Sequence, residues 1–168
     1  GGTLVEVAGR VAGVEHPLSF KITRRNSARC PVREYGMGAD GIGNIYFERF
    51  VDGCSRDVGR AVVDLKEQGA KALVIDMRGN PGGPLSEAVE VTNLFVPRGQ
   101  KVVYTKGKLA SVNSEHYPKK EPLDVDIPVA VLVDGSTASS AEIVSGAWPD
   151  WDRDVIVGER TYGQGLVH

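Results

Sequence analysis

The chain has 168 residues, of which 41% are hydrophobic, so it can form one domain with a substantial core. Its formal net charge of −2 argues against a protein that binds nucleic acid or lies on an anionic membrane. No apolar run approaches the roughly 18 residues that a transmembrane helix needs, and no basic-then-apolar leader is present. Membrane association is therefore expected only through parts outside this sequence.

The first 25 residues alternate apolar and polar side chains around a bend that contains glycine. This pattern predicts a hairpin with strands at residues 4–11 and 18–22. Because two strands alone are marginal in water, we expect the hairpin to belong to a larger unit. Residues 26–40 are polar and rich in Arg, Pro and Gly, which predicts a linker.

From Gly41 onward, apolar strands alternate with amphipathic helices. Strands are predicted at 42–50, 72–77, 101–105, 128–134 and 154–158, and helices at 55–69, 84–95 and 139–148. The alternation predicts an α/β domain with a mostly parallel sheet, and the apolar run 72–77 is typical of a strand covered on both faces. Residues 106–126 interrupt this rhythm with a long polar excursion, for which a functional loop and a disordered loop are the alternatives.

The first junction whose groups could take part in a reaction is the segment VIDMRGNPGG, residues 74–83, which joins a strand to a helix. In an α/β sheet, ligands meet the carboxyl ends of the strands. Backbone N–H groups of a glycine turn at that edge can bind an anion or a developing oxyanion. The alternative is a tight turn whose glycines only accept positive φ.

The second junction is the segment VLVDGSTASSAEIVSG, residues 131–146. Ser139 follows an apolar strand at the start of a helix, where a nucleophile gains from the helix dipole and nearby amides. Ser139 and Glu142 also fit the Ser-x-x-Glu capping box, so a purely capping role is the alternative. The Gly-x-Ser-x-Gly elbow of the α/β-hydrolases is absent from this segment.

The histidines give little support for a Ser–His pair. His16 falls in the hairpin, His116 in the polar excursion and His168 at the last position, and each is interpreted as a surface residue. Asp150 is interpreted as a solvated carboxylate, with an orienting role as the alternative. Trp148 is expected to pack at the end of the third helix.

The two cysteines, Cys30 and Cys54, are predicted to be free thiols, with one disulfide between them as the alternative. No histidine lies near either one at metal-ligand spacing, so no metal site and no cofactor are expected.

Taken together, the motifs resemble the carboxyl-terminal (tail-specific) processing peptidases, a family of serine proteases. The matching stretches are DGIGNIYFERF, LKEQGAKALVIDMRGNPGGPLSEAVEVTNLFVPRGQ and IPVAVLVDGSTASSAEIVSGAWPDWDRDVIVGERTYGQG. The resemblance implies a crotonase/ClpP-like core at 41–168, shortened at its C-terminus. It also identifies residues 1–25 with the last hairpin of a PDZ domain, followed by a linker at 26–40.

The resemblance also implies a Ser–Lys mechanism. Ser139 aligns with the nucleophile, and Gly83 and the amide of Ser140 align with the oxyanion-hole donors. Asp150 aligns with an aspartate that matters in some members. The lysine that acts as general base aligns with position 164, where this chain has Gln164.

A glutamine amide has no usable basicity near neutral pH, whereas a desolvated lysine can take the hydroxyl proton. The chain is therefore predicted to be inactive unless His168, on the same face of an extended strand, replaces the base. The glutamine is either a deliberate change of lysine, which stops cleavage, or natural to a protein that binds peptides without cutting them.

By resemblance, the expected substrates are peptides or proteins with extended C-terminal segments outside the cytoplasm, in the periplasm or cell envelope. The oligomeric state is left open, with a homo-oligomer as one option. The alternatives are a non-catalytic peptide-binding relative and an acyl-CoA enzyme of the crotonase type, for which no basic, nucleotide-sized site is evident.

Overall fold

The computed structural model describes residues 3–9, 18–23, 31–148 and 154–166 of the chain. The elements in chain order are β1 Leu4–Gly9, β2 Leu18–Thr23, β3 Val32–Met37, β4 Ile42–Phe47, α1 Cys54–Glu67, β5 Ala72–Asp76, α2 Leu85–Thr92, β6 Val103–Thr105, η1 Ala110–Val112, β7 Ser114–His116, β8 Val129–Val133, α3 Ser140–Ala147 and β9 Asp154–Gly158. The order of strands and helices expected from residue 41 onward is confirmed, with bounds that differ by a few residues.

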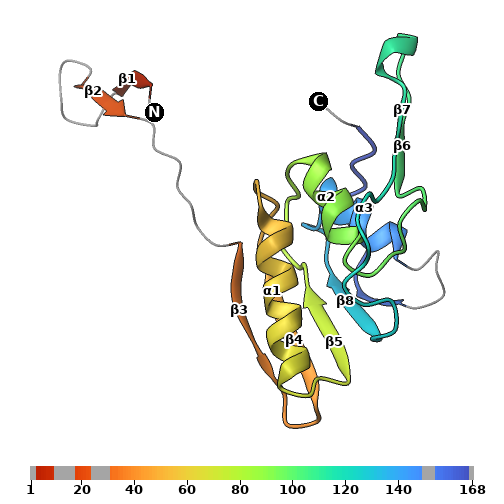
Figure 1. Ribbon diagram of the computed structural model, residues 1–168. Coiled ribbons are helices and arrows are strands. Elements are labelled where there is room, and N and C mark those ends of the chain that lie inside the picture. Colours follow the sequence, from red (N-terminus) through yellow and green to blue (C-terminus); the bar gives the residue numbers. More distant parts are fainter. Residues whose placement is uncertain (1–2, 10–17, 24–30, 149–153, 167–168) are drawn as a thin grey trace.

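A five-stranded sheet organises the body of the molecule (Figure 1). Its strand order is β3-β4-β5-β8-β9, with β4, β5, β8 and β9 parallel and β3 antiparallel to β4. The predicted α/β class with a mostly parallel sheet is thus confirmed. Since parallel strands end at the same edge, the segments that follow β5 and β8 lie side by side there.

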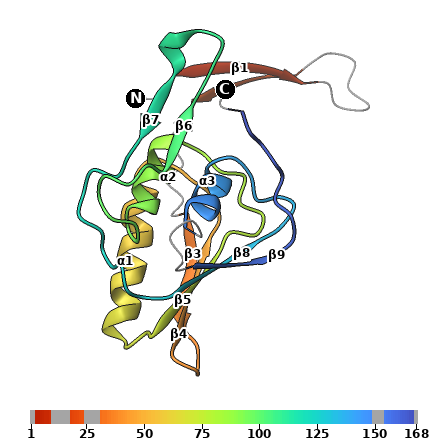
Figure 2. The same ribbon diagram turned by 90° about the vertical axis from the view of Figure 1, so that its right-hand side faces the viewer.

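Helices cover one face of this sheet. The buried stripe of α1 consists of Val58, Ala61, Val62 and Leu65, and it packs in one cluster with the inward side chains of β4, β5 and β8. In Figure 2, α1 and α2 lie on the same side of the strands. At the end of α3, Trp148 is fully buried against Phe95, as expected, with ring centroids 5.2 Å apart.

The opposite face of the sheet is only half covered in the described residues. Along β5, fully buried residues such as Leu73 alternate with half-buried ones such as Val74. Strand β9, at the sheet edge, leaves Val155 and Val157 exposed. The expectation of a strand covered on both faces therefore holds for the helix side alone.

Strand β3 corrects the linker prediction. Residues 32–37 fall within the expected linker at 26–40, yet they pair with β4 and extend the sheet. Only Val32 of this strand is buried, because an antiparallel edge strand has one neighbour and exposes most side chains. Its polar composition therefore resembles that of a loop. Polar contacts such as the 2.6 Å bond from the Tyr35 hydroxyl to Asp64 hold it to α1.

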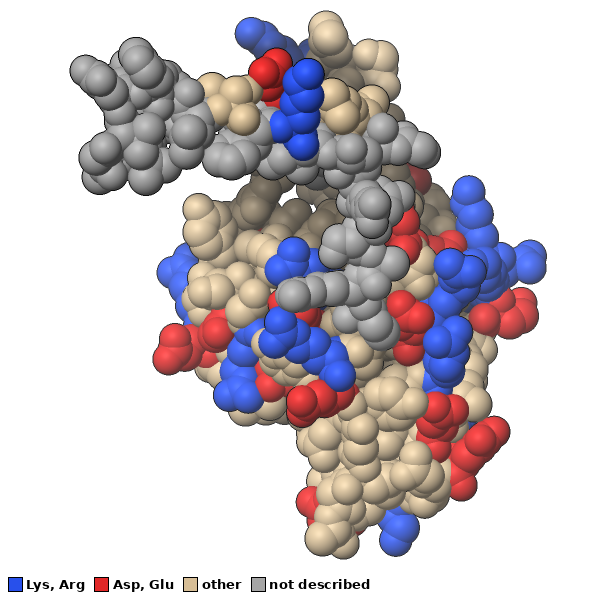
Figure 3. Space-filling model, turned by 90° about the vertical axis from the view of Figure 1, so that its left-hand side faces the viewer, with Lys and Arg blue, Asp and Glu red and all other residues tan. Residues whose placement is uncertain are grey.

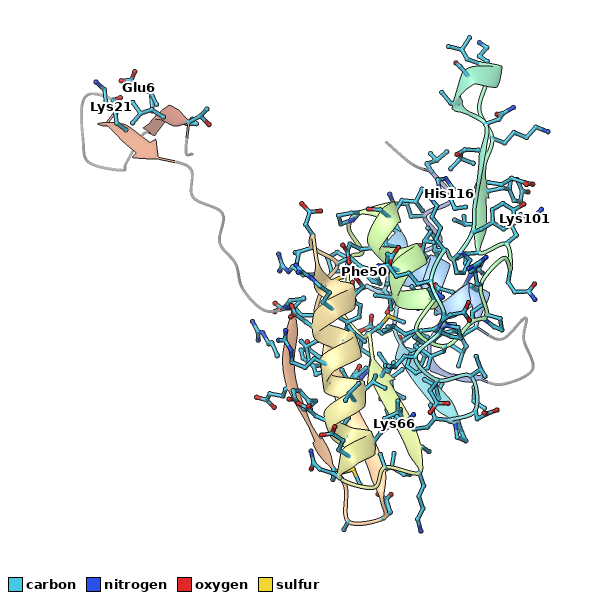
Figure 4. All side chains as sticks on the ribbon, in the orientation of Figure 1. Glu6, Lys21, Phe50, Lys66, Lys101 and His116 are labelled. Carbon is cyan, nitrogen blue, oxygen red and sulfur yellow. The ribbon has the colours of Figure 1, made fainter. Side chains whose placement is uncertain are left out.

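The polar excursion forms an ordered arm. Strand β6 pairs with β7 in a two-stranded antiparallel sheet, with the short helix η1 between them. The Thr105 hydroxyl contacts Ser114 Oγ at 2.7 Å and donates to the Val112 carbonyl at 2.9 Å, which closes the arm. Figure 4 shows His116 and Lys101 on this arm, which projects from the body.

The N-terminal hairpin is confirmed as two antiparallel strands, with Leu4 opposite Thr23 and Gly9 opposite Leu18. It forms a sheet of its own. Its assignment to a PDZ domain stays a prediction, and so does the domain boundary at 25.

Cys54 is a free, fully buried thiol, as predicted, and its burial raises its pKa to about 12. Cys30 lies outside the described residues. Among the helices in the described ranges, none combines the length and apolar character needed to cross a membrane.

A side chain of α2 caps the N-terminus of helix α1. Glu87 accepts the backbone N–H groups of Gly53 at 2.8 Å and Ser55 at 3.0 Å. Burial alone would raise the pKa of Glu87, but these bonds to its ionised form lower it. The carboxylate thus satisfies N–H groups that have no acceptor inside the helix.

Replacing this cap tests its contribution. Glu87→Ala is expected to lower the free energy of unfolding by about 0.5–2 kcal/mol, the usual range for a lost N-terminal cap. Glu90→Ala is the matched control on the same helix, because it removes only an ion pair with the largely exposed Lys120 side chain. It should lower the free energy of unfolding by about 0–1 kcal/mol. Urea titration measures both values, and equal losses would contradict the capping role.

Candidate active site

Ser139 stands at the turn between β8 and α3 in a strained conformation. Its φ of 54° and ψ of −120° place it in a region that side-chain-bearing residues rarely adopt. It is the one residue other than glycine with positive φ in the described part of the chain. Strained residues of this kind gather at active sites, where the surrounding structure holds them in place.

Capping and strain coincide at Ser139. The residue is the N-cap of α3 and forms a capping box with Glu142, whose carboxylate accepts the Ser139 backbone N–H at 2.9 Å. The Ser139 hydroxyl faces the backbone N–H of Glu142 but forms no hydrogen bond with it. The Glu142 N–H donates instead to the Ser139 carbonyl, also at 2.9 Å. The capping box is therefore confirmed, and within the described residues the Ser139 hydroxyl makes no side-chain cap hydrogen bond.

The glycine turn packs directly against this serine. A Cβ atom on Gly82 would lie 2.6 Å from the Ala138 carbonyl oxygen and 2.7 Å from the Ser140 nitrogen. A Cβ atom on Gly83 would lie 2.1 Å from the carbonyl oxygen of Phe50. The Ser140 hydroxyl donates to the Gly83 carbonyl at 2.7 Å. Glycine is thus required at both positions by close approach of the backbone.

Two amides at this contact are available to a ligand. Within the residues that the structure describes, neither the Gly83 N–H nor the Ser140 N–H donates to an acceptor. The Ser140 amide begins α3, where the first N–H groups have no partner inside the helix. A negatively charged oxygen that meets both amides would be stabilised there.

A cleft of about 310 Å³ joins these groups to position 164. Its lining consists of Gly83, Pro84, Leu85, Ser139, Ser140, Ile143, Gln164 and Leu166. Ser139 and Gln164 therefore line one cleft at the glycine turn. The Gln164 side chain donates from Nε2 to the Leu166 carbonyl at 3.3 Å.

Other hollows of similar or larger volume lie away from this serine. One of about 420 Å³ lies between α1, α2 and residues 120–123, and one of about 520 Å³ lies on the open face of β3, β4 and β5. Neither contains Ser139 or the glycine turn. On the face shown in Figure 3, acidic and basic side chains are interspersed, without a broad region of one sign. The cleft at Ser139 is therefore the hollow whose residues could carry out a reaction.

The carboxylate of Glu142 holds the C-terminal strap, residues 161–164, in the cleft. Oε1 accepts the Thr161 hydroxyl at 2.8 Å and the Gly163 N–H at 2.6 Å. Oε2 accepts the Gln164 backbone N–H at 2.9 Å, together with that of Ser139. Burial alone would raise the pKa of Glu142, but these four bonds to the ionised form lower it.

Asp134 organises the loop before Ser139. Its Oδ1 accepts the backbone N–H groups of Gly79 at 3.0 Å and Ser136 at 2.9 Å, and the bond from Gly79 is the main cause of its lowered pKa. The Thr137 hydroxyl donates to the Met77 carbonyl at 2.9 Å. The loops after β5 and β8 are thus joined by hydrogen bonds just before Gly82 and Gly83.

The other sequence-predicted candidates separate from the cleft or cannot be placed. His116 lies on β7 beside Ser114, with Nε2 2.9 Å from Ser114 Oγ, and it does not line the cleft. His16, Asp150 and His168 lie outside the described residues. The described ranges hold no group of three or more His, Cys, Asp or Glu side chains that could bind a metal ion.

Sequence reasoning missed the positions that hold the cleft together. It treated Glu142 only as a capping residue, because the Ser-x-x-Glu pattern describes a local contact. The bonds from Glu142 to residues 161–164 span about twenty positions and carry no local signal. Asn80 was part of the glycine motif, but its buried contacts also depend on distant segments.

Comparison with known proteins gives one consistent family. Residues 41–168 match the model of peptidase family S41. The chain is 33% identical over 159 residues to a carboxyl-terminal-processing protease of Synechocystis sp., which covers 93% of this chain and 36% of that protein. It is 35% identical over 153 residues to the chloroplastic carboxyl-terminal-processing peptidase 1 of Arabidopsis thaliana, covering 89% of this chain and 31% of that protein.

The solved structure of a photosystem II D1 C-terminal processing protease matches with a TM-score of 0.73 and 27% identity, over 98% of this chain and 46% of that one. The chain therefore belongs to peptidase family S41, and the resemblance to carboxyl-terminal processing proteases seen in the sequence is confirmed. It spans about a third of the length of these curated relatives.

Two glycine substitutions test the close approach at Ser139. Gly82→Ala and Gly79→Ala both place a side chain at positive φ, but only the first Cβ atom meets other atoms, since nothing lies within 4 Å of a Cβ on Gly79. Gly82→Ala is expected to cost about 1–3 kcal/mol more of unfolding free energy, the range for overpacking. Chemical denaturation of both variants measures this difference, and equal costs would argue against tight contact.

The lowered pKa of Glu142 makes stability depend on pH. A carboxyl whose folded-state pKa lies below its ordinary 4.5 stabilises the fold above that pH, and this contribution is lost as the pH falls through the folded-state pKa. Glu142→Gln is therefore expected to be less stable than the parent at pH 7, with the difference shrinking toward pH 3. Denaturation midpoints from pH 7 to 3 measure it, and a constant difference would refute the linkage.

Proposed function

We propose that this chain is the catalytic core of a serine endopeptidase that cleaves near the C-termini of other proteins, with an impaired proton acceptor. The observation that carries the proposal is the shared cleft, in which the strained Ser139, the glycine turn and position 164 meet. Membership of the S41 family supports the reaction class.

In the proposed reaction, Ser139 Oγ attacks the carbonyl carbon of the scissile bond. The carbonyl oxygen becomes an oxyanion that the amides of Gly83 and Ser140 stabilise. With lysine at position 164, the hydroxyl proton would pass to the neutral amine and then to the leaving amine, which leaves an ester on Ser139. Water hydrolyses that ester and regenerates the hydroxyl.

Gln164 blocks the proton transfer in this scheme. A neutral lysine amine has a lone pair for the proton, whereas a carboxamide nitrogen has none available near neutral pH. The cleft itself tolerates the change, because the strap is held through the backbone N–H of residue 164. We therefore propose that the chain binds substrate and cleaves it poorly. Asp150 is proposed as an accessory residue on the resemblance alone.

Substrates and location follow from the relatives as proposals. The apolar lining by Pro84, Leu85, Ile143 and Leu166 suits an extended peptide with apolar side chains near the scissile bond. We propose substrates outside the cytoplasm, because the resembling family acts on such proteins. A homo-oligomer is compatible with this proposal but is not required by it.

A second candidate function is non-catalytic peptide binding. The observation that favours it is the glutamine at the base position, since a binding module needs the cleft but no proton acceptor. On this alternative, Ser139→Ala leaves peptide affinity unchanged, and a serine-directed phosphonate does not label the protein even after Gln164→Lys.

Restoring the base distinguishes these two functions. Gln164→Lys is expected to raise the rate of peptide cleavage by about 10²–10⁴, the contribution of a positioned general base. The matched control is Gln164→Lys combined with Ser139→Ala, which should be inactive. Cleavage of a fluorogenic C-terminal peptide, with phosphonate labelling followed by mass spectrometry, gives the measurement. Equally vigorous hydrolysis by the parent and Gln164→Lys would reject the role of position 164.

A further inference from the structure

We infer that Asn80 is a positioning residue that sets the Gly82–Gly83 turn at its working distance from Ser139. The inference rests on the proposed function, because the turn matters as the source of an oxyanion-binding amide. It assigns a role to a buried side chain that does not line the cleft.

The side chain of Asn80 makes two hydrogen bonds in a fully buried position. Its exposed fraction is 0%. Its Oδ1 accepts the Gly82 N–H at 2.9 Å, and its Nδ2 donates to the Phe47 carbonyl at the end of β4 at 2.8 Å. The amide thus ties the glycine turn to the rigid end of a central strand.

The backbone of Asn80 reaches the other half of the site. Its carbonyl oxygen accepts the Ala138 N–H at 2.9 Å, and Ala138 directly precedes Ser139. Its N–H donates to the Met77 carbonyl at 3.1 Å, which closes the turn after β5. One residue therefore connects the turn, the serine loop and the end of β4.

Removing the Asn80 side chain breaks its side-chain hydrogen bonds and keeps its backbone hydrogen bonds. The backbone bond to Ala138 survives any substitution, so the serine loop keeps its attachment. The bond to Gly82 is lost, and the Gly82 N–H and Phe47 carbonyl are left without partners in a buried place. We therefore expect Asn80→Ala to shift the glycine turn relative to Ser139 and leave the serine loop in place.

Asparagine suits this position because both ends of its amide are used. Leucine has the volume but no polar atoms, and aspartate keeps the acceptor for Gly82 but loses the donor to Phe47 unless it is protonated. Asn80→Asp is therefore the conservative variant, which retains the bond that sets the turn.

Asn93 offers a matched control elsewhere in the fold. It is also buried, with 4% exposed, and its amide also bridges backbone groups. Its Nδ2 donates to the Lys120 carbonyl at 2.9 Å and its Oδ1 accepts the Lys120 N–H at 3.1 Å. These contacts join the end of α2 to residue 120, and Asn93 does not line the Ser139 cleft. Asn93→Ala thus removes similar bonds without touching the glycine turn.

The kinetic test compares Asn80→Ala, Asn80→Asp and Asn93→Ala, each combined with Gln164→Lys. At a temperature where circular dichroism shows all to be folded, Asn80→Ala is expected to lower kcat about 10²-fold, the cost of misplacing a reacting group by about 1 Å. KM should change by no more than a few fold, because none of the side chains that line the cleft is replaced. Asn80→Asp should retain more of kcat than Asn80→Ala, and Asn93→Ala should match the parent.

A second measurement is independent of catalysis. Hydrogen–deuterium exchange in the unmodified Gln164 background should show faster exchange at the Gly82 amide in Asn80→Ala, with no change there in Asn93→Ala. If Gln164→Lys cleaves no peptide, the proposed function fails while this exchange result still decides the role of Asn80. Unchanged exchange at Gly82, or equal kcat for the Asn80→Ala and Asn93→Ala variants, would overturn the inference. If Asn80→Ala does not fold, Asn80→Leu serves both tests, because leucine fills the volume and removes both side-chain bonds.

Discussion

The arrangement of the cleft depends on the carboxylate of Glu142, which binds two segments that lie far apart in the sequence. On one side it accepts the backbone N–H of Ser139, and on the other it accepts three groups of the strap at 161–164. An ionised carboxylate with four donors is well satisfied even when it is partly buried. The strained serine and position 164 are thereby fixed to one another through a single side chain.

The parallel sheet supplies the frame for this contact. Because β5 and β8 are adjacent and parallel, the glycine turn and the serine loop leave the sheet at the same edge. Their separation is then set by Asn80 and Asp134, which bond across from one loop to the other, and by the absence of a Cβ atom at Gly82. The site therefore combines rigid strand ends with short polar links, and the strain at Ser139 is held by both.

The sequence predicted the elements whose signals are local. The stripe of α1, the apolar runs of β5 and β8 and the Ser-x-x-Glu pattern each occupy one short segment, and each appears in the structure. Strand β3 was missed because its side chains are mostly exposed, so only its pairing with β4 identifies it. The strap contacts of Glu142 and the bridge made by Asn80 were missed for a related reason, since both join residues that only the folded chain brings together.

The same geometry explains how a glutamine can stand at the position proposed for a catalytic base without disturbing the fold. Glu142 holds residue 164 by its backbone N–H, so the hydrogen bond that anchors the strap does not depend on which side chain residue 164 carries. The Gln164 amide instead bonds to the Leu166 carbonyl, within the strap itself. In the proposed reaction, binding and proton transfer are therefore carried by separable groups: the backbone and apolar walls shape the cleft, and the side chain at position 164 is the one proposed to take the proton of the serine hydroxyl.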